Sequence, residues 1–362
     1  MVKKTFLFLT VIFLSICPSR TEGRKIHFIY CSDVHYGLER EFRGDTVSAD
    51  SVSRAMLEAF RILEHTALPP DGGIDEGKMF GTPDFVICTG DIANRMEDGV
   101  QSANASWQQF LSDWEGVSPL FLVPGNHDIS NAIGYTKPLE PERDPSSAVG
   151  IYNIMMSPDT LLTPEDFDYS CNRTHFAFVT DSIRFVFMGM WPDATMREWY
   201  EDSLGDDGLP TLLFTHDPPE AEAKHFTNPR KPNDINPEDG FQNLLSDTCT
   251  VRDTDARPKG NWRALEDFIA DHPEIRAYFH GDCNYNEFYT WKGVDGRISL
   301  PVFRVDSPMK GEYSSEDETL LSFIVVTIDT GTRLLTAREC LWNTGMRPGI
   351  KWGESATVRL GR

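Results

Sequence analysis

The sequence predicts an α/β protein in which short buried strands alternate with covering helices. Apolar runs rich in β-branched and aromatic residues are typical of buried strands, and a polar turn follows several of them. Between the first two runs, residues 48–65 repeat apolar side chains at helical spacing. The order strand, helix, strand predicts parallel pairing. With 362 residues and 40% hydrophobic content, the chain can bury a large core in one or two domains.

The first residues have the layout of a secretory signal. A basic start at Met1–Lys4 precedes an apolar run over residues 5–16, which is too short to span a bilayer. We therefore expect residues 1–22 to be removed and the chain to be exported, either to a periplasm or outside the cell. An N-terminal anchor and a lipid attached to Cys17 are the alternatives. No later segment has the ~18 consecutive apolar residues of a membrane span, so none is expected in the mature chain.

The cysteines and the net charge limit the class of protein. Six of the seven cysteines lie after residue 22, which in an exported chain favours disulfides. Cys31 and Cys88 end apolar runs, however, which predicts buried free thiols, while Cys171 and Cys249 are a candidate surface disulfide. The net charge of -22 repels a phosphate backbone, so general nucleic-acid binding, and with it a nuclease, is disfavoured.

Candidate metal ligands follow the first two expected strands. The strand over residues 25–30 ends just before Asp33 and His35. These residues are two apart, so in an extended backbone both side chains project to the same side and can bind one cation. The next strand, which ends at Cys88, runs through a glycine turn into Asp91. A carboxylate at the end of a strand can bridge two cations.

A third strand, over residues 118–123, leads into the most informative local motif, Pro-Gly-Asn-His-Asp. Proline and glycine force a tight turn at the end of the strand. Asn126 then offers a neutral oxygen ligand, and His127 can donate a proton to a leaving oxygen. We expect Asp128 to hold the His127 ring in the required orientation.

The second half of the chain supplies a further histidine at the end of a strand. Residues 175–179 and 183–189 are close enough for a hairpin that begins a second sheet. The strand over residues 211–215 then delivers His216. Residues 217–258 are rich in Pro, Asn, Asp and Glu and lack a period, which predicts an insertion over the site rather than core. Solvated loop charges are the favoured interpretation of His225, Arg230 and Lys231 in this segment, and the alternative is that they meet a substrate phosphate or a polar head group.

A polar cluster follows the strand expected at residues 275–279. His280, Asp282 and Asn284 alternate, so an extended backbone aims all three the same way. We expect Asp306–Pro308 to be a turn. Closing strands that suit the edge of the second sheet are expected at residues 287–291, 302–305, 321–328 and 334–337, before a tail at 346–362. Further helices are expected at residues 106–114, 151–156 and 261–271.

Four of these motifs, in their order and rough spacing, resemble the calcineurin-like metallophosphoesterase family: Asp33-x-His35, Gly90-Asp91, Gly125-Asn126-His127-Asp128 and Thr215-His216-Asp217-Pro218. The resemblance implies a phosphoesterase domain over residues 23–345. It also implies a four-layer αββα sandwich of two mixed β-sheets flanked by helices, with a dinuclear metal site at the carboxyl ends of the central strands. The implied roles are that Asp33 and His35 bind the first metal, Asp91 bridges, Asn126 and His216 bind the second, and His127 contacts the phosphate and protonates the leaving group.

The chain departs from the family in its last metal loop, where the family motif is Gly-His-x-His. Alignment on Gly281 puts Asp282 at the position of the second-metal histidine and Asn284 at that of the first-metal histidine. A small bulge at Gly281 would recruit His280 instead, so both completions remain open. Oxygen ligands in place of imidazoles favour Mn or Mg over Zn, and among the candidate cofactors Mn, Fe, Zn and Mg we favour Mn. Asn94 stands where purple acid phosphatases carry a tyrosine, so a ferric tyrosinate is not expected.

Together these features predict a metal-dependent phosphoric ester hydrolase, either a phosphomonoesterase or a phosphodiesterase. Two metals on the order of 3.5–4 Å apart would lower the pKa of a bridging water for in-line attack, and His127 would protonate the leaving alkoxide. The expected partner is a small phosphate ester or a lipid head group. The alternative, motivated by the missing Gly-His-x-His, is an exported non-catalytic or degenerate relative that binds without turnover.

Overall fold

The computed structural model describes residues 23–94, 100–117, 119–134, 141–205, 207–232, 235, 240–249 and 257–361. The expected signal segment, residues 1–22 with Cys17, lies outside the described residues. Within those ranges every helix is too short or too polar to cross a lipid bilayer.

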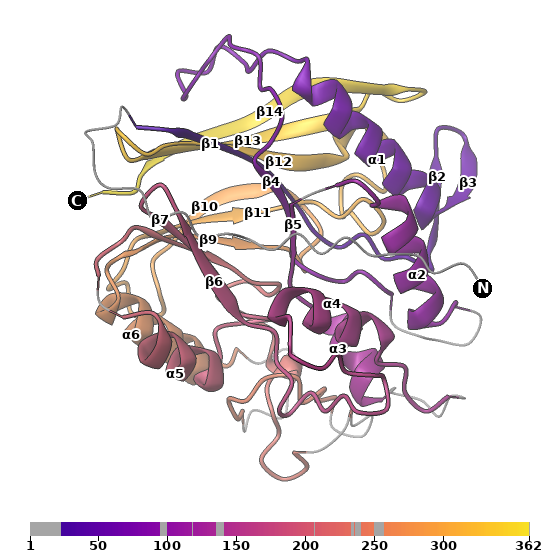
Figure 1. The fold of residues 1–362 in the computed structure, drawn as a ribbon, viewed down its shortest axis with the longest axis vertical. Helices are drawn as coiled ribbons and strands as arrows, with labels where there is room; N and C mark the ends of the chain where they lie inside the picture. Colours follow the sequence, from indigo (N-terminus) through magenta and orange to yellow (C-terminus); the bar gives the residue numbers. More distant parts are fainter. Residues whose placement is uncertain are drawn as a thin grey trace.

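Two six-stranded mixed sheets lie face to face (Figure 1). The first has the order β14-β13-β12-β1-β4-β5 and consists of β1 (Lys25–Cys31), β4 (Phe85–Cys88), β5 (Leu120–Leu122), β12 (Ser322–Asp329), β13 (Leu334–Asn343) and β14 (Pro348–Arg359). The second has the order β10-β11-β9-β8-β7-β6 and consists of β6 (Phe176–Thr180), β7 (Ile183–Phe187), β8 (Thr211–Phe214), β9 (Ile275–His280), β10 (Glu287–Trp291) and β11 (Leu300–Arg304). Strands β1, β4 and β5 of the first sheet are parallel to one another, and so are β7, β8, β9 and β11 of the second.

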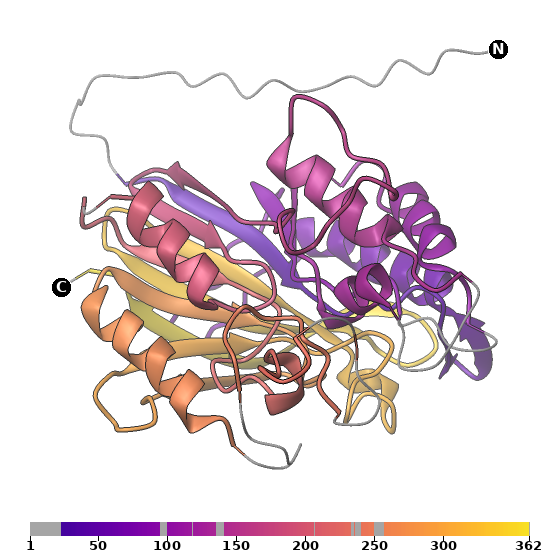
Figure 2. The ribbon, with the colours of Figure 1, turned by 90° about the horizontal axis from the view of Figure 1, so that it is seen from below.

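Helices cover the outer faces of both sheets. On the first sheet lie α1 (Ala49–Glu64) and α2 (Ala103–Asp113), and on the second α5 (Ala194–Ser203) and α6 (Lys259–Asp271) lie side by side (Figures 1 and 2). The remaining elements are α3 (Asn126–Ile133), α4 (Ser146–Met156), the hairpin β2 (Glu39–Phe42) with β3 (Asp45–Ser48), and the short helices η1 (Ala223–His225) and η2 (Glu318–Leu320). The fold is the four-layer αββα sandwich that was expected.

The alternation of side chains in β1 explains why this strand lies at the centre of the sandwich. Phe28 and Tyr30 point into the core between the two sheets, whereas Ile29 and Cys31 point into the core beneath α1. Phe28 is fully buried, which contributes about 1.5–3 kcal/mol of transfer free energy. It stacks on Phe85 with ring centroids 5.2 Å apart. A strand that is apolar on both faces in this way requires a layer on each side.

Several expectations about the second half of the chain are wrong. The hairpin of β6 and β7 does begin the second sheet. However, β12 and β13 pair in the first sheet beside β1, and most of the expected tail forms β14. The expected insertion is partly core, because buried side chains such as Phe226 and Leu245 pack against the second sheet. The segment lacks a regular apolar pattern because its loops bury apolar residues singly rather than along one face of a helix or strand.

The cysteines are free thiols in the part of the chain that the structure describes. Cys31 and Cys88 are buried, as expected. Cys171 is exposed whereas Cys249 is buried in the core of the second sheet, so the expected surface disulfide between them is wrong.

Candidate metal centre

The candidate ligands lie at or just beyond the carboxyl ends of parallel strands. In the first sheet they follow β1, β4 and β5, and in the second sheet they lie at the end of β9 or follow β8 and β9. Because parallel strands end at the same edge of a sheet, residues distant in sequence meet there. The two sheets therefore contribute jointly to one site.

Glycines let these loops approach one another more closely than other residues would. Gly90 has a φ of +100°, and a Cβ on it would lie 2.2 Å from the backbone nitrogen of Gly125. A Cβ on Gly281 would lie 2.2 Å from Oδ2 of Asp33. Contacts this short do not occur, so a side chain at either position would push the loops apart.

Five of the candidate ligands have a left-handed backbone conformation. The φ angles are 57° for Asp33, 42° for His35, 50° for Asp91, 60° for Asp282 and 59° for Asn284. The expectation of an extended backbone with alternating side chains is therefore wrong at these loops. Backbone strain of this kind costs of order 1–3 kcal/mol per residue and clusters at ligand-binding sites.

The first group of candidate ligands surrounds the ring of His35. Its Nε2 lies 3.7 Å from Oδ1 of Asp33 and 3.6 Å from Oδ2 of Asp91. Among the described residues, Oδ1 of Asp33 and both ring nitrogens of His35 are buried without a hydrogen-bond partner. Oδ1 of Asn284, on the loop of Asp282, is likewise buried and unpaired there. Buried polar atoms are rarely left unpaired, and a cation would satisfy these. The donor set fits one divalent ion.

The second group surrounds the ring of His216. Its Nδ1 donates a hydrogen bond to the carbonyl oxygen of Thr89 at 2.7 Å, which leaves Nε2 able to bind a metal. That Nε2 lies 3.6 Å from Oδ1 of Asp91, 3.7 Å from Oδ1 of Asp282 and 3.2 Å from Oδ1 of Asn126. The donor set fits a second divalent ion, and Asp91 offers one carboxylate oxygen to each group.

Crowding of buried carboxylates perturbs the titration of this site. Burial raises the pKa of Asp91, and the nearby Asp33 raises it further. Burial and Asp217 raise the pKa of Asp282 to about 6. Burial alone would lower the pKa of His216, but the carboxylates around it, Asp91 first, raise this pKa to about 10. The site therefore holds more negative charge than it can bury without a cation.

His127 lies at the open side of the two groups. Its backbone N–H donates to Oδ1 of Asp91 at 2.8 Å, and its Nε2 is 3.8 Å from Oδ2 of the same residue. The His127 side chain is 17% exposed, whereas that of His216 is fully buried. Among the candidate residues, His127 is thus placed to meet a substrate that approaches from solvent.

Asp128 has a different place from the one expected. Its Oδ2 accepts hydrogen bonds from the backbone N–H groups of Ile92 and Gly125, and its Oδ1 accepts one from that of Ala93, each at 3.1 Å. Asn126, His127 and Asp128 begin helix α3, so successive side chains point in different directions. Asp128 therefore holds the loop of Asp91 against the loop of Asn126, and the expectation that it orients the His127 ring is wrong.

His280 is turned away from both groups. Its Nδ1 lies 2.9 Å from the carbonyl oxygen of Gly281, and its Nε2 lies 3.1 Å from the hydroxyl of Tyr289. Burial lowers the pKa of His280 to about 3, so the ring is neutral. Of the two completions that the sequence left open, the geometry brings Asp282 to the second group, and Asn284 lies on the same loop.

Sequence reasoning missed the contribution of the loop after β11. Ser307, expected to belong to a simple turn, donates its hydroxyl hydrogen bond to the carbonyl oxygen of Asp33 at 2.8 Å and accepts one from the backbone N–H of Lys310 at 2.9 Å. Nζ of Lys310 lies 3.3 Å from Nε2 of His127. This loop thus adds a positive charge to the open side of the site. A lone lysine after a turn carries no local signal for such a role.

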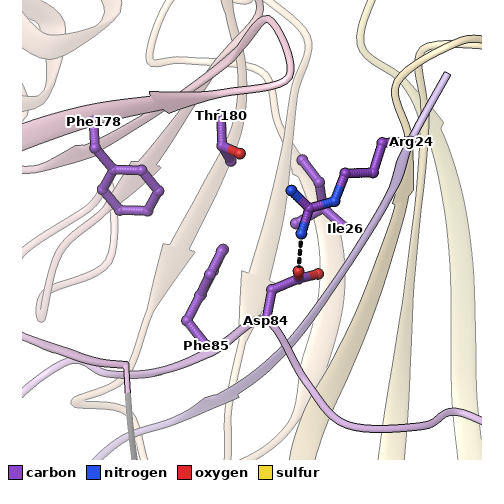
Figure 3. Close-up of a pocket in the computed structure, with 6 residues that line it drawn as sticks. All are labelled: Arg24, Ile26, Asp84, Phe85, Phe178 and Thr180. Carbon is purple, nitrogen blue, oxygen red and sulfur yellow. Dashed lines mark hydrogen bonds and ion pairs between the residues drawn. The ribbon is translucent and has the colours of Figure 1, made fainter. Parts of the chain in front are cut away.

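A cavity of about 200 Å³ lies at the opposite ends of β1 and β4 (Figure 3). Its lining residues are Arg24, Ile26, Asp84, Phe85, Phe178 and Thr180. Arg24 and Asp84 form an ion pair there. No lining residue belongs to the candidate ligands, so this cavity is not part of the metal centre.

Substitution of Gly281 by alanine should separate the loop after β9 from Asp33. The added methyl group would fall on the Asp33 carboxylate and the Ser32 hydroxyl, both of which are fixed by burial. We expect metal affinity to fall at least about tenfold, measured by metal analysis after gel filtration. Gly260→Ala, at a position where a Cβ meets nothing, is the matched control and should retain wild-type affinity. Equal affinities in the two variants would contradict the close approach.

The chain is similar to one protein family and to several solved structures. A family model described as calcineurin-like phosphoesterase matches residues 26–288. No curated protein sequence matches the chain significantly. A solved structure titled "Structure of PhoD" aligns with a TM-score of 0.50 and 10% identity over 93% of this chain and 70% of that one. A dimetal phosphatase from Danio rerio aligns with a TM-score of 0.47 and 12% identity over 93% and 99% of the two chains.

Proposed function

Because the chain belongs to the calcineurin-like phosphoesterase family, we propose that it hydrolyses phosphoric esters with two divalent cations. The observation that carries this proposal is the position of Asp91, whose two carboxylate oxygens face different groups of ligands. The buried carboxylates and unpaired polar atoms around it support a cation on each side.

The ligands would divide between the two cations as follows. Asp33, His35 and Asn284 would hold the first, Asn126, His216 and Asp282 the second, and Asp91 both. When bound, the cations supply an activated water and offset the negative charge of the phosphoryl oxygens. Oxygen donors outnumber imidazoles in this set, which favours Mn or Mg over Zn, with Mn our first choice.

The protein's own residues would bind the phosphate and move the proton. His127, at the open side of the site, would donate a proton to the leaving oxygen. Lys310, next to it, would hold a phosphoryl oxygen by charge. The net charge of -22 supports a small phosphate ester or lipid head group rather than nucleic acid as substrate. Export through the expected signal segment belongs to the same proposal.

Removal and return of metal test the proposed reaction. Purified protein treated with a chelator should lose the ability to hydrolyse aryl phosphate monoesters or diesters, and Mn²⁺ should restore it. Comparison of the two ester classes would identify the preferred substrate type. Metal retention without turnover on any ester would instead favour the alternative, a non-catalytic binding protein.

Replacement of Lys310 by methionine should weaken catalysis without loss of metal. A charge-assisted contact to phosphate contributes about 1.5–3 kcal/mol, so kcat/KM should fall roughly 10- to 100-fold. Metal content by elemental analysis should not change, because Lys310 is not a ligand. Lys292→Met removes the same charge from an exposed position after β10 and is the matched control. A Lys310→Met enzyme with wild-type kcat/KM would remove this residue from the proposal.

A further inference from the structure

Asp217 is a buried carboxylate next to the proposed second cation. It follows His216 on the loop after β8 and is fully buried. Its backbone carbonyl accepts hydrogen bonds from the hydroxyls of Thr215 and Tyr278, each at 2.9 Å. Its Oδ2 accepts one from Nδ1 of His225 at 2.8 Å, whereas its Oδ1 has no hydrogen-bond partner among the described residues. One oxygen of a rigidly held, buried carboxylate is thus unsatisfied.

The surroundings of Asp217 indicate what that oxygen faces. Ligand atoms of His216, Asp217 and Asp282 lie within 4.8 Å of one another. Two buried carboxylates at such a distance repel each other unless a cation lies between them. His216 and Asp282 already belong to the second group around Asp91. Asp217 therefore lies beside the cation proposed for that group.

His225 connects Asp217 to another ligand of the same group. It lies in η1 and is fully buried. Because Nδ1 donates to Asp217, Nε2 is free to accept, and it lies 3.5 Å from the side-chain amide nitrogen of Asn126. A hydrogen bond from that amide group leaves Oδ1 of Asn126 directed at the His216 side of the site. A single imidazole between two ligands in this way fixes the orientation of both.

We propose that Asp217 is an additional ligand of the second cation and that His225 is the positioning residue that holds it. The inference rests on the proposed two-metal function and extends it to residues of the segment 217–258. Asp91, Asp217 and Asp282 would surround the second cation with carboxylates, with His216 as its imidazole. Such a site prefers a hard ion such as Mn²⁺ or Mg²⁺ to Zn²⁺.

Metal-free protein can be titrated with Mn²⁺ while electron paramagnetic resonance measures the concentration of free Mn²⁺. This titration gives the number of binding sites and their affinities independently of turnover. Wild-type protein should bind two ions. Asp217→Asn should keep one site at wild-type affinity and weaken the other by at least about tenfold, and His225→Gln should weaken the same site by roughly 10- to 100-fold. The weakened site should also lose its preference for Mn²⁺ over Zn²⁺ in competition.

His280→Gln is the matched control, because His280 is an equally buried histidine near the same loops that contacts Tyr289 instead. It should bind two Mn²⁺ ions as the wild type does. Metal-free Asp217→Asn should unfold at no lower temperature than wild type, since it removes one of several mutually repelling charges. If that variant does not fold, His225→Gln carries the test.

Two sites of wild-type affinity in Asp217→Asn would overturn the ligand role, and the same result in His225→Gln alone would overturn the positioning role. Weakening of both sites by the same factor would indicate a general effect on the fold and would also overturn the proposal. Wild-type protein that binds fewer than two Mn²⁺ ions would refute the two-metal function itself, together with this inference. If wild-type protein binds two Mn²⁺ ions and turns over normally, a negative result with the variants would contradict only the roles of Asp217 and His225, and the two-metal function would stand.

Discussion

Substitution of Asp91 by asparagine should abolish turnover and metal loading together. The two carboxylate oxygens of Asp91 face different groups, Oδ2 at 3.6 Å from Nε2 of His35 and Oδ1 at 3.6 Å from Nε2 of His216. Each cation contributes several kcal/mol of transition-state stabilisation, so the loss of even one should lower kcat at least about a thousandfold. The measurement combines steady-state hydrolysis of an aryl phosphate with elemental analysis of the protein.

Asp84→Asn is the matched control for this change. Asp84 lies just before β4, at the opposite end of the strand that delivers Asp91, and accepts a hydrogen bond from the backbone N–H of His27. Its substitution should cost some stability but keep metal content and kcat near wild type. An Asp91→Asn protein that retained two metals and full activity would end the two-metal proposal.

Substitution of His127 by glutamine should lower turnover in a way that depends on the leaving group. Loss of a general acid costs about 10²- to 10⁴-fold when the leaving oxygen must be protonated. An alkyl phosphate, whose alkoxide is a poor leaving group, should show the full loss, whereas a nitrophenyl phosphate should lose much less. Metal content should stay at two ions, because His127 lies outside the two ligand groups we propose.

A plot of rate against leaving-group pKa separates this role from simple phosphate binding. The glutamine side chain of the His127→Gln variant can still donate a hydrogen bond, so a role in binding alone would give equal losses for all esters. Equal losses would therefore contradict the proton-donor role of His127. His65→Gln, at an exposed position beyond α1, should leave both rates unchanged.

Much of the fold follows from local patterns that can be found in the sequence. The alternation in β1 identifies a strand with a core on each face, and the helical spacing of Val52, Met56 and Phe60 identifies the inner face of α1. These patterns do not show which strands pair with one another. Nothing local to β12 or β13 says that they pair beside β1 rather than at the edge of the second sheet. The pairing of strands that are distant in sequence depends on how all the elements of the fold pack together.

The sequence predicted which residues form the candidate site better than it predicted their geometry. Asp33 and His35 do converge, but through left-handed backbone conformations rather than the alternation of an extended strand. Lys310 was missed because it is brought to the site only by tertiary contacts, such as the bond from Ser307 to Asp33. Asp217 directly follows His216, but its position in the sequence does not show what its carboxylate faces. Ordered motifs mark the ends of strands, whereas residues recruited from other loops leave no such mark.

The distribution of ligands over loops from both sheets links metal binding to the folding equilibrium of the whole chain. Each of the two proposed cations would take ligands from both sheets, Asp33 and Asn284 for the first and Asn126 and His216 for the second. The cations would thus act as reversible cross-links that only the native state can form. By mass action, free metal at 100 times its dissociation constant would stabilise the native state by about 2.7 kcal/mol per site. The ionic composition of its surroundings would then set the melting temperature and protease resistance of this protein as well as its catalytic rate.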